Sequence, residues 1–298
     1  MTYAPWLWIV FTLLAAGGQT IRNAMQRELT ASLGTVGATQ VRFLFGFPFA
    51  LLSLLAVALI AGVPLPRPNP SYWPWLLVGA LAQIAATALM LAAMGGRSFV
   101  VVVAYIKTEP IQVAIFGLLF LGDAVSLPMM VAIVIATAGV LVMSVKPGGM
   151  TGGIKPTLVG LASGAMFAVS AIGYRGAILN VSAGHFVMAA TFTLACGLVL
   201  QAALLTVYLA LRDRPVLVAI AAQWRRSLFA GFMGAFASQF WFLAFAIATA
   251  ASVRTLALVE VLFAQAISVF VFGQKTSPRE LIGIVLIVVG VVLLIWAH

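Results

Sequence analysis

Residues 109–123 read EPIQVAIFGLLFLGD, and residues 260–274, 151 positions later, read EVLFAQAISVFVFGQ. Both segments start with a glutamate, continue as an apolar run and end in glycine followed by a polar residue. The same shift carries residues 139–142 (GVLV) onto 290–293 (GVVL). With small gaps allowed, Arg22 also aligns with Arg175. These matches indicate an internal repeat.

The composition around this repeat is that of a membrane protein. The chain has 298 residues, of which 64% are hydrophobic and 7% are charged, and its mean hydropathy is +1.18. A soluble domain has about 25% charged residues. The net charge of +10 is spread thinly between apolar runs, so it forms no patch for nucleic acid. The composition argues against a soluble enzyme, a disordered protein, a coiled coil and a nucleic-acid-binding protein.

A transmembrane helix needs about 20 mostly apolar residues. Division of the chain at polar, Gly and Pro positions predicts ten such spans, and the Gly/Pro-rich segment 146–156 separates the first five from the last five. We therefore expect an all-α integral membrane protein with two five-helix repeats, residues 1–148 and 149–298. Because five is odd, the second repeat must be inverted relative to the first. The ten expected spans are 5–27, 35–62, 72–95, 99–121, 127–145, 157–180, 184–211, 227–249, 252–272 and 279–297.

The loops give the orientation. Lys and Arg are concentrated in the loops after the odd-numbered spans, whereas the loops after the even-numbered spans hold only Arg67. Positive loops stay in the cytoplasm. This count predicts cytoplasmic odd-numbered loops and places both termini outside. We read no cleaved signal peptide at the start, because no positively charged segment precedes the first span.

Glu109 and Glu260 are the first candidates for function, since the repeat places them at similar depths near the middle of their spans. A charge at the bilayer centre costs at least about 2.5–3.5 kcal/mol and needs a reason. Such a carboxylate can carry a coupling proton or bind a cationic group of a substrate. The alternative is a structural ion pair with Lys107, Arg254 or Arg42.

The segment 105–110 is expected to be a kinked turn, because Pro110 removes a helical hydrogen bond. In a regular helix Lys107 and Glu109 would be about 200° apart, so we expect Lys107 to face a neighbouring helix. One continuous stripe at helical spacing is predicted to face the substrate path. It consists of Tyr105, Glu109, Gln112 and Phe116.

Further polar side chains lie within the apolar spans. The first span has a stripe that is too polar for lipid, and it includes Gln19, Arg22 and Asn23. For Arg22 the alternative is that the side chain extends to the membrane surface. Arg42 lies deeper and is expected to bind an anion or a carboxylate. The remaining candidates, some of which can equally serve helix packing, are Gln83, Tyr174, Arg175, Gln239, Trp241, Arg254 and Gln265.

Motifs for catalysis and cofactor binding are not found. The sequence has no P-loop, no His-Glu-x-x-His segment and no serine nucleophile elbow. It has one cysteine, Cys196, and no pair of histidines or cysteines at metal-ligand spacing. We expect a protein that is not an enzyme and that uses no metal or cofactor.

Four segments of the chain resemble the drug/metabolite transporter superfamily: residues 109–123 and 260–274, and the runs 139–142 and 290–293, which begin with glycine. The resemblance is to its bacterial ten-helix branch with two EamA domains. The chain departs from the family pattern at Asp123 and Gln274, where glutamate is usual, and at Val261, where proline is usual. The resemblance implies helices around a central cavity, alternating access without a cofactor, and a bacterial inner membrane location. It would place both termini in the cytoplasm, opposite to the charge count.

These observations predict a secondary active transporter of a small polar or amphoteric organic metabolite, such as an amino acid. We expect an exporter that is coupled to protons, lies in the lipid bilayer as a monomer or homodimer, and has no nucleic-acid partner. In this hypothesis Glu109 and Glu260 bind substrate or proton, and Arg42 receives an anionic group. The alternatives are an importer of an anionic metabolite or vitamin, a lipid-headgroup translocase, and a partner subunit that does not itself transport.

Overall fold

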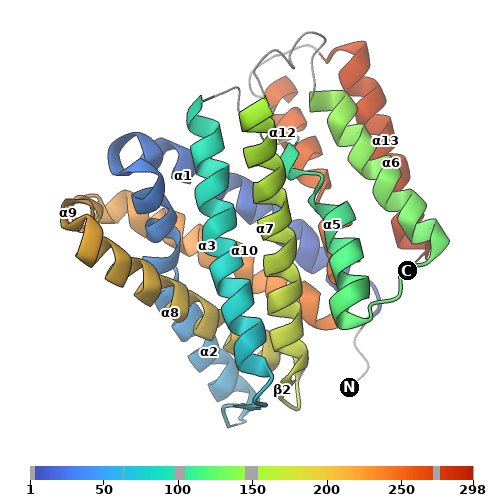
Figure 1. Ribbon diagram of the computed structural model, residues 1–298. Helices are drawn as coiled ribbons and strands as arrows, with labels where there is room; N and C mark the ends of the chain where they lie inside the picture. Colours follow the sequence, from blue (N-terminus) through green and yellow to red (C-terminus); the bar gives the residue numbers. More distant parts are fainter. Residues whose placement is uncertain (1–3, 63, 97–104, 145–153, 271–275, 298) are drawn as a thin grey trace.

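The computed structural model describes residues 4–62, 64–96, 105–144, 154–270 and 276–297 (Figure 1). This part of the chain is almost entirely helical. Two two-residue strands, β1 (Arg67–Pro68) and β2 (Val181–Ser182), pair antiparallel. The helices are α1 (Leu7–Leu44), α2 (Phe47–Ala61), α3 (Tyr72–Gly96), α5 (Glu109–Phe116), the π-helix η1 (Gly117–Leu121), α6 (Leu127–Ser144), α7 (Ile154–Leu179), α8 (Phe186–Arg212), α9 (Arg214–Ala222), α10 (Trp224–Ile247), α11 (Ala250–Leu256), α12 (Val259–Phe270) and α13 (Pro278–Ala297).

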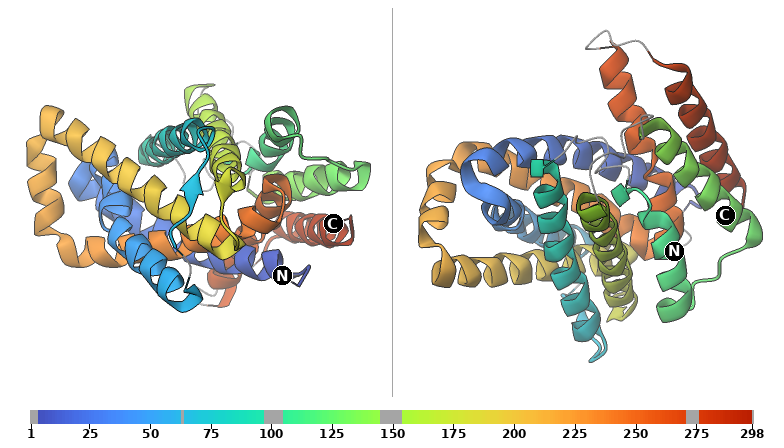
Figure 2. Two further views of the ribbon diagram at one scale, coloured as in Figure 1. Left: turned by 90° about the horizontal axis from the view of Figure 1, so that it is seen from below. Right: turned by 45° about the horizontal axis from the view of Figure 1, so that its top comes forward.

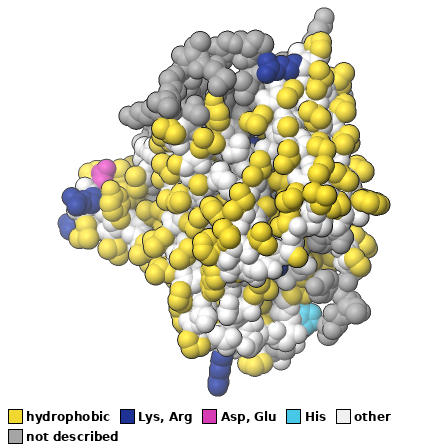
Figure 3. Space-filling model, turned by 45° about the vertical axis from the view of Figure 1, so that its right-hand side comes forward, with side chains coloured by type: hydrophobic (Ala, Val, Ile, Leu, Met, Phe, Trp, Pro, Cys, Tyr) yellow, Lys and Arg dark blue, Asp and Glu magenta, His cyan; other side chains and the backbone are white. Residues whose placement is uncertain are grey.

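The outer surface is apolar, as a lipid environment requires. Within the described residues six helical stretches are long and apolar enough to cross a membrane: the stretch through α1 and α2, then α3, α7, α8, α10 and α13. Many leucine and valine side chains on these helices and on α6 are exposed. On the face in Figure 3, hydrophobic side chains cover the broad middle and Lys and Arg lie mainly at the margins. The chain is a multi-pass membrane protein.

Helices from the two halves of the chain pack in pairs. α3 packs along α7, α1 along α10 and α6 along α13, and α2 contacts α8 (Figures 1 and 2). Small residues allow this proximity. A Cβ added to Gly173 would lie 2.6 Å from the backbone nitrogen of Gly79 in α3, and one added to Gly139 would lie 2.8 Å from the carbonyl oxygen of Gly283 in α13. The core therefore lies between the repeats as well as within them.

The boundary between the first two expected spans is a kink rather than a loop. Gly34 has φ 66° and ψ 177°, a conformation inside α1 that is open almost only to glycine. It joins two helical segments of α1 within the predicted gap of residues 28–34. A second break, at residues 45–46, separates α1 from α2 and interrupts the expected span 35–62.

Two helices are broken at equivalent places in the repeats. The turn at Lys107 and Thr108 precedes α5, and the break at Ala257 and Leu258 separates α11 from α12. At both sites the backbone bonds tighten to a three-residue spacing, as from the N–H of Thr108 to the carbonyl of Tyr105. The kink predicted from Pro110 is present, whereas the expected span 252–272 was not predicted to break.

Candidate functional site

Among the described residues three ion pairs link the two repeats, and two of them lie at the broken helices. Nζ of Lys107 lies 2.5 Å from Oε2 of Glu260, and Nε of Arg254 lies 3.1 Å from Oε1 of Glu109. Each pair joins one residue from the first half of the chain to one from the second. Glu109 and Glu260 are 7% and 8% exposed. Both predicted carboxylates are therefore buried and paired, as in the structural alternative considered from the sequence.

A glutamine and a tryptophan connect the two pairs. Gln19 in α1 donates from Nε2 to Oε2 of Glu260 at 3.3 Å, and Nε1 of Trp241 donates to Oε1 of Gln19 at 3.1 Å. The guanidinium of Arg254 lies 4.5 Å from the centre of the Trp241 ring, at cation–π distance. The ion-pair cluster, as we name it, consists of Gln19, Lys107, Glu109, Trp241, Arg254 and Glu260.

The broken helices explain how these charges meet. Glu109 and Glu260 each lie in the first turn of the helix that restarts after the break, α5 and α12. Free backbone N–H groups at a helix start favour a negative charge there. Because the helix is interrupted at Lys107, the expected 200° separation from Glu109 does not apply, and both side chains reach the cluster.

A second group of charges lies next to the cluster. Arg22 and Arg42 are 1% and 2% exposed. Nη2 of Arg22 donates to Oδ1 of Asn23 at 2.7 Å, and Nη1 of Arg42 donates to Oγ1 of Thr87 at 3.2 Å. Both side chains pack on Gly234 of α10, where an added Cβ would lie 3.2 Å from Cγ of Arg42 and 3.5 Å from Cδ of Arg22. The alternative in which the side chain of Arg22 extends to the membrane surface does not fit this burial.

Arg175 forms an ion pair that the sequence did not predict. Its Nε and Nη2 each lie 3.1 Å from an oxygen of Asp123, and its Nη1 donates to the carbonyls of Phe245 and Ala248 at the end of α10. Gly122, with φ 67°, ends η1 and turns the chain toward this contact. The sequence analysis identified Asp123 only as a departure from the family motif, and no pattern in the sequence pointed to Arg175 as its partner.

A family comparison decides what kind of protein carries this arrangement. The model of the EamA-like transporter family matches residues 6–145 and again residues 154–296. The chain belongs to the EamA-like transporter family. The resemblance drawn from the motifs is confirmed, and the protein is a membrane transporter rather than an enzyme.

The fold of the transporter also occurs among solved structures. It is similar to a chain titled "Crystal structure of protein", with a TM-score of 0.72 and 15% sequence identity over 97% of this chain and 94% of the other. This likeness concerns the fold alone. No curated protein sequence matches the transporter.

Several predicted residues of the transporter lie outside the ion-pair cluster. Gln83 accepts a hydrogen bond from Gln201, and Gln239 donates to Thr191. Tyr174 packs on Phe242, with 4.6 Å between ring centres. The remaining ones are Tyr105, which lies against Gly160, Gln112, which donates to Thr108, and Gln265, which donates to Thr276. In the described part of the chain, no group of three or more His, Cys, Asp or Glu could hold a metal ion.

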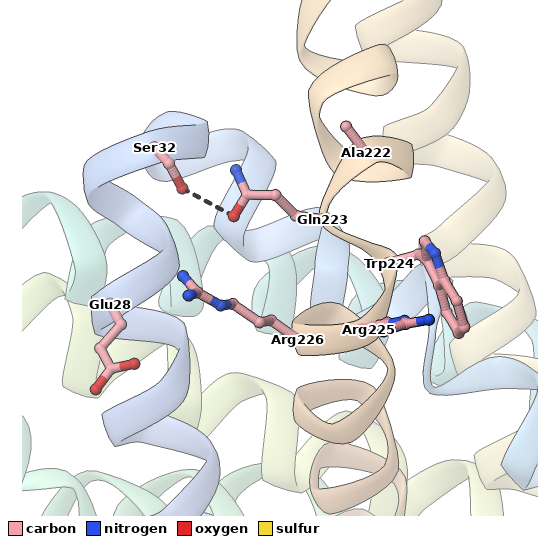
Figure 4. Close-up of a pocket in the computed structure, with 7 residues that line it drawn as sticks. All are labelled: Glu28, Ser32, Ala222, Gln223, Trp224, Arg225 and Arg226. Atoms are coloured by element: carbon pink, nitrogen blue, oxygen red, sulfur yellow. Dashed lines mark hydrogen bonds between the residues drawn. The ribbon is translucent and has the colours of Figure 1, made fainter.

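The transporter also has a surface pocket of about 640 Å³ that no sequence pattern indicated. It lies where the junction of α9 and α10 faces residues 28–32 of α1 (Figure 4). Ser32 and Gln223 both line it, and Oγ of Ser32 donates a hydrogen bond to Oε1 of Gln223. Its lining includes Glu28, Arg225 and Arg226. None of the predicted site residues lines this pocket.

Proposed function

We propose that the chain is a secondary active transporter that exports a small polar or amphoteric organic metabolite by alternating access. It spans the bacterial inner membrane with ten helices in two inverted repeats, residues 1–148 and 149–298. The observation that carries this proposal is the pair of crossed ion pairs, Lys107–Glu260 and Glu109–Arg254. Buried charges in membrane segments are costly and mark substrate or ion pathways.

The pattern of helix packing supports inverted repeats. The proposed symmetry relates the third span to the eighth and the sixth span to the first. The contact between the third and sixth spans should therefore recur between the eighth and first spans. The helices agree with this, since α3 packs on α7 and α10 packs on α1. β1 and β2 join the loops after the second and sixth spans. The pocket joins the segments after the first and seventh spans. Each contact links loops that ten crossings would place on the same side.

The ion-pair cluster offers a switch for alternating access. While both glutamates are ionised, each ties a cation of the other repeat, and this attraction holds the repeats together. A proton on a glutamate removes its charge and frees the cation. A cationic group of a substrate can likewise replace Lys107 at Glu260. Binding energy or a proton gradient thereby changes the contact between the repeats, as a population shift requires.

The test uses Glu109→Gln together with Glu260→Gln in proteoliposomes with a pH gradient. The transported compound is chosen by a thermal-shift screen of amino acids, nucleotides, sugar phosphates, vitamins and cationic drugs at two pH values. Gradient-dependent transport should be lost in the double variant and kept in Glu280→Gln, which changes a carboxylate near the start of α13. Unchanged transport in the double variant would exclude the proton-carrier role.

The direction of transport needs a separate measurement. Inside-out vesicles should accumulate the compound of an exporter, and right-side-out vesicles that of an importer. Accumulation only in right-side-out vesicles would replace the proposed exporter by an importer.

A further inference from the structure

Among the described residues, neither Arg22 nor Arg42 forms an ion pair with a carboxylate. The chain has six Asp and Glu residues, and the structure describes all of them. Three are in the ion pairs already described, with Lys107, Arg254 and Arg175. The other three are Glu280, which accepts a bond from the N–H of Ser277, and the exposed Glu28 and Asp213. The two arginines are therefore buried cations without an acidic partner.

The repeat shows where a partner is missing. Arg22 aligns with Arg175, whose guanidinium binds Asp123 through two nitrogens. The repeat counterpart of Asp123 is residue 274, which is glutamine in this chain. A glutamine side chain has no charge, so the repeat offers Arg22 no carboxylate equivalent to Asp123. Residue 274 lies outside the described residues, but its chemistry follows from the sequence alone.

The guanidinium donors of this pair are only partly used. Nε and Nη1 of Arg22 and Nε of Arg42 are buried without a hydrogen-bond partner. Glu260 attracts Arg22 from the ion-pair cluster, whereas Arg254 repels it, and Arg22 and Arg42 repel one another. Burying unpaired charges costs several kcal/mol unless an opposite charge joins them. The ion-pair cluster next to them has two cations and two carboxylates, so the excess charge of the whole region is that of the two arginines.

We infer that Arg22 and Arg42 together bind an oxyanion, a carboxylate or phosphate group, of the transported molecule. A guanidinium presents its donors in a planar fork that fits both groups. Gln19, three residues before Arg22 in α1, bonds with Glu260. A molecule with its oxyanion at the arginines can thus direct a cationic group toward Glu260. This inference rests on the proposed function and specifies its substrate as an organic acid or an amphoteric molecule.

The test measures anion binding by the purified full-length transporter without any transport step. Inorganic phosphate and succinate are the probes, with potassium chloride at equal ionic strength as the reference, and the readouts are thermal unfolding and calorimetry. The variants are Arg22→Met and Arg42→Met. The matched control is Arg67→Met, which removes an exposed arginine in β1.

At least one probe should raise the unfolding temperature of the wild type and of the control, and its binding should be at least tenfold weaker in both test variants. The unfolding temperature without ligand should not fall in these variants, because methionine removes a buried charge that has no partner. Stabilisation by phosphate alone identifies a phosphate site, and stabilisation by succinate identifies a carboxylate site.

Three results would overturn the inference. The first is a probe response in Arg22→Met and Arg42→Met equal to that of the wild type, and the second is no response in the wild type. The third is a clear loss of stability without ligand in both variants, which indicates a structural role. If arginine-dependent binding is found but the reconstituted wild type shows no gradient-driven transport, the proposed function fails and the anion site remains.

Discussion

Arg175 and Arg22 show how repeat-related residues acquire different environments. All the nitrogens of Arg175 contact an acceptor: Nε and Nη2 meet Asp123, and Nη1 meets two carbonyls at the end of α10. Arg22 has one bond, to Asn23, and two buried nitrogens without a partner. Arg175 stabilises the fold by joining the end of η1, α7 and the end of α10. Arg22 keeps free the donors that the inferred oxyanion site would use.

We predict that Asp123→Asn lowers stability by about 3 kcal/mol or more, because it leaves a buried guanidinium without its counter-charge. Thermal unfolding of the purified protein measures this change. Asp213→Asn makes the same substitution at an exposed turn between α8 and α9 and should change stability by less than about 0.5 kcal/mol. Equal stability of the two variants would show that the contact with Arg175 contributes nothing.

The sequence identified the buried charges but could not choose their partners. It offered Lys107, Arg254 and Arg42 as equal candidates for the glutamates, and the structure selects Lys107 for Glu260 and Arg254 for Glu109. The selection depends on how helices some 150 residues apart pack, and no local pattern contains that information. The transport roles of these side chains stay predictions.

At the scale of the helices, the two breaks differ in how far they could be predicted. The break before α5 follows from Pro110, which cannot continue a helical ladder. At the break before α12 the residue that corresponds to Pro110 is Val261. Valine does not interrupt a helix as proline does, so the local sequence does not predict this break. Only the repeat points to it, since residues 107–108 and 257–258 are about one repeat apart. The helical fold itself was predictable from the apolar runs, whereas the position of this break depends on contacts between the halves.

The kink in α1 leads to a second prediction. Gly34 has φ 66° and ψ 177°, and a Cβ there would meet nothing within 4 Å. Gly34→Ala should therefore destabilise the protein only through backbone strain, by about 1–3 kcal/mol. Gly17→Ala is the matched control in the same helix, since its Cβ also meets nothing and its φ is not positive. It should be neutral or stabilising.

Thermal unfolding of both glycine variants, with the wild type alongside, measures the difference. A Gly34→Ala protein as stable as Gly17→Ala would mean that the two segments of α1 can join as a regular helix. The predicted boundary between the first two spans would then need to be moved.

At the scale of the whole molecule, the distribution of loop charges and the contacts between loops agree on which segments share a side. Lys and Arg gather in the segments after odd-numbered spans, and the arginine-lined pocket of Figure 4 joins two of these segments. Arg67 lies in β1, which pairs with β2 in another even-numbered loop. Only the charge count predicts which of the two sides is cytoplasmic.

Cysteine labelling tests this orientation. In a Cys196→Ala background, Arg67→Cys and Arg214→Cys each place a single thiol at an exposed position. A membrane-impermeant maleimide added to intact cells should label the first variant and leave the second unlabelled until the membrane is permeabilised. The reverse pattern would put both termini in the cytoplasm, as the family resemblance implies. Labelling of both in intact cells would contradict ten crossings.

The crossed ion pairs also constrain how the protein is made. Lys107 and Glu109 enter the membrane with the first half of the chain, while Arg254 and Glu260 are still untranslated. At about 5–20 residues per second, the ribosome needs roughly 8–30 s to add the 151 residues that separate the two glutamates. During that interval the first charged turn must remain hydrated or be held by the insertion machinery. Assembly of the ion-pair cluster therefore waits for the segment that holds Arg254 and Glu260, and a nascent chain that stops before it carries Lys107 and Glu109 without these partners.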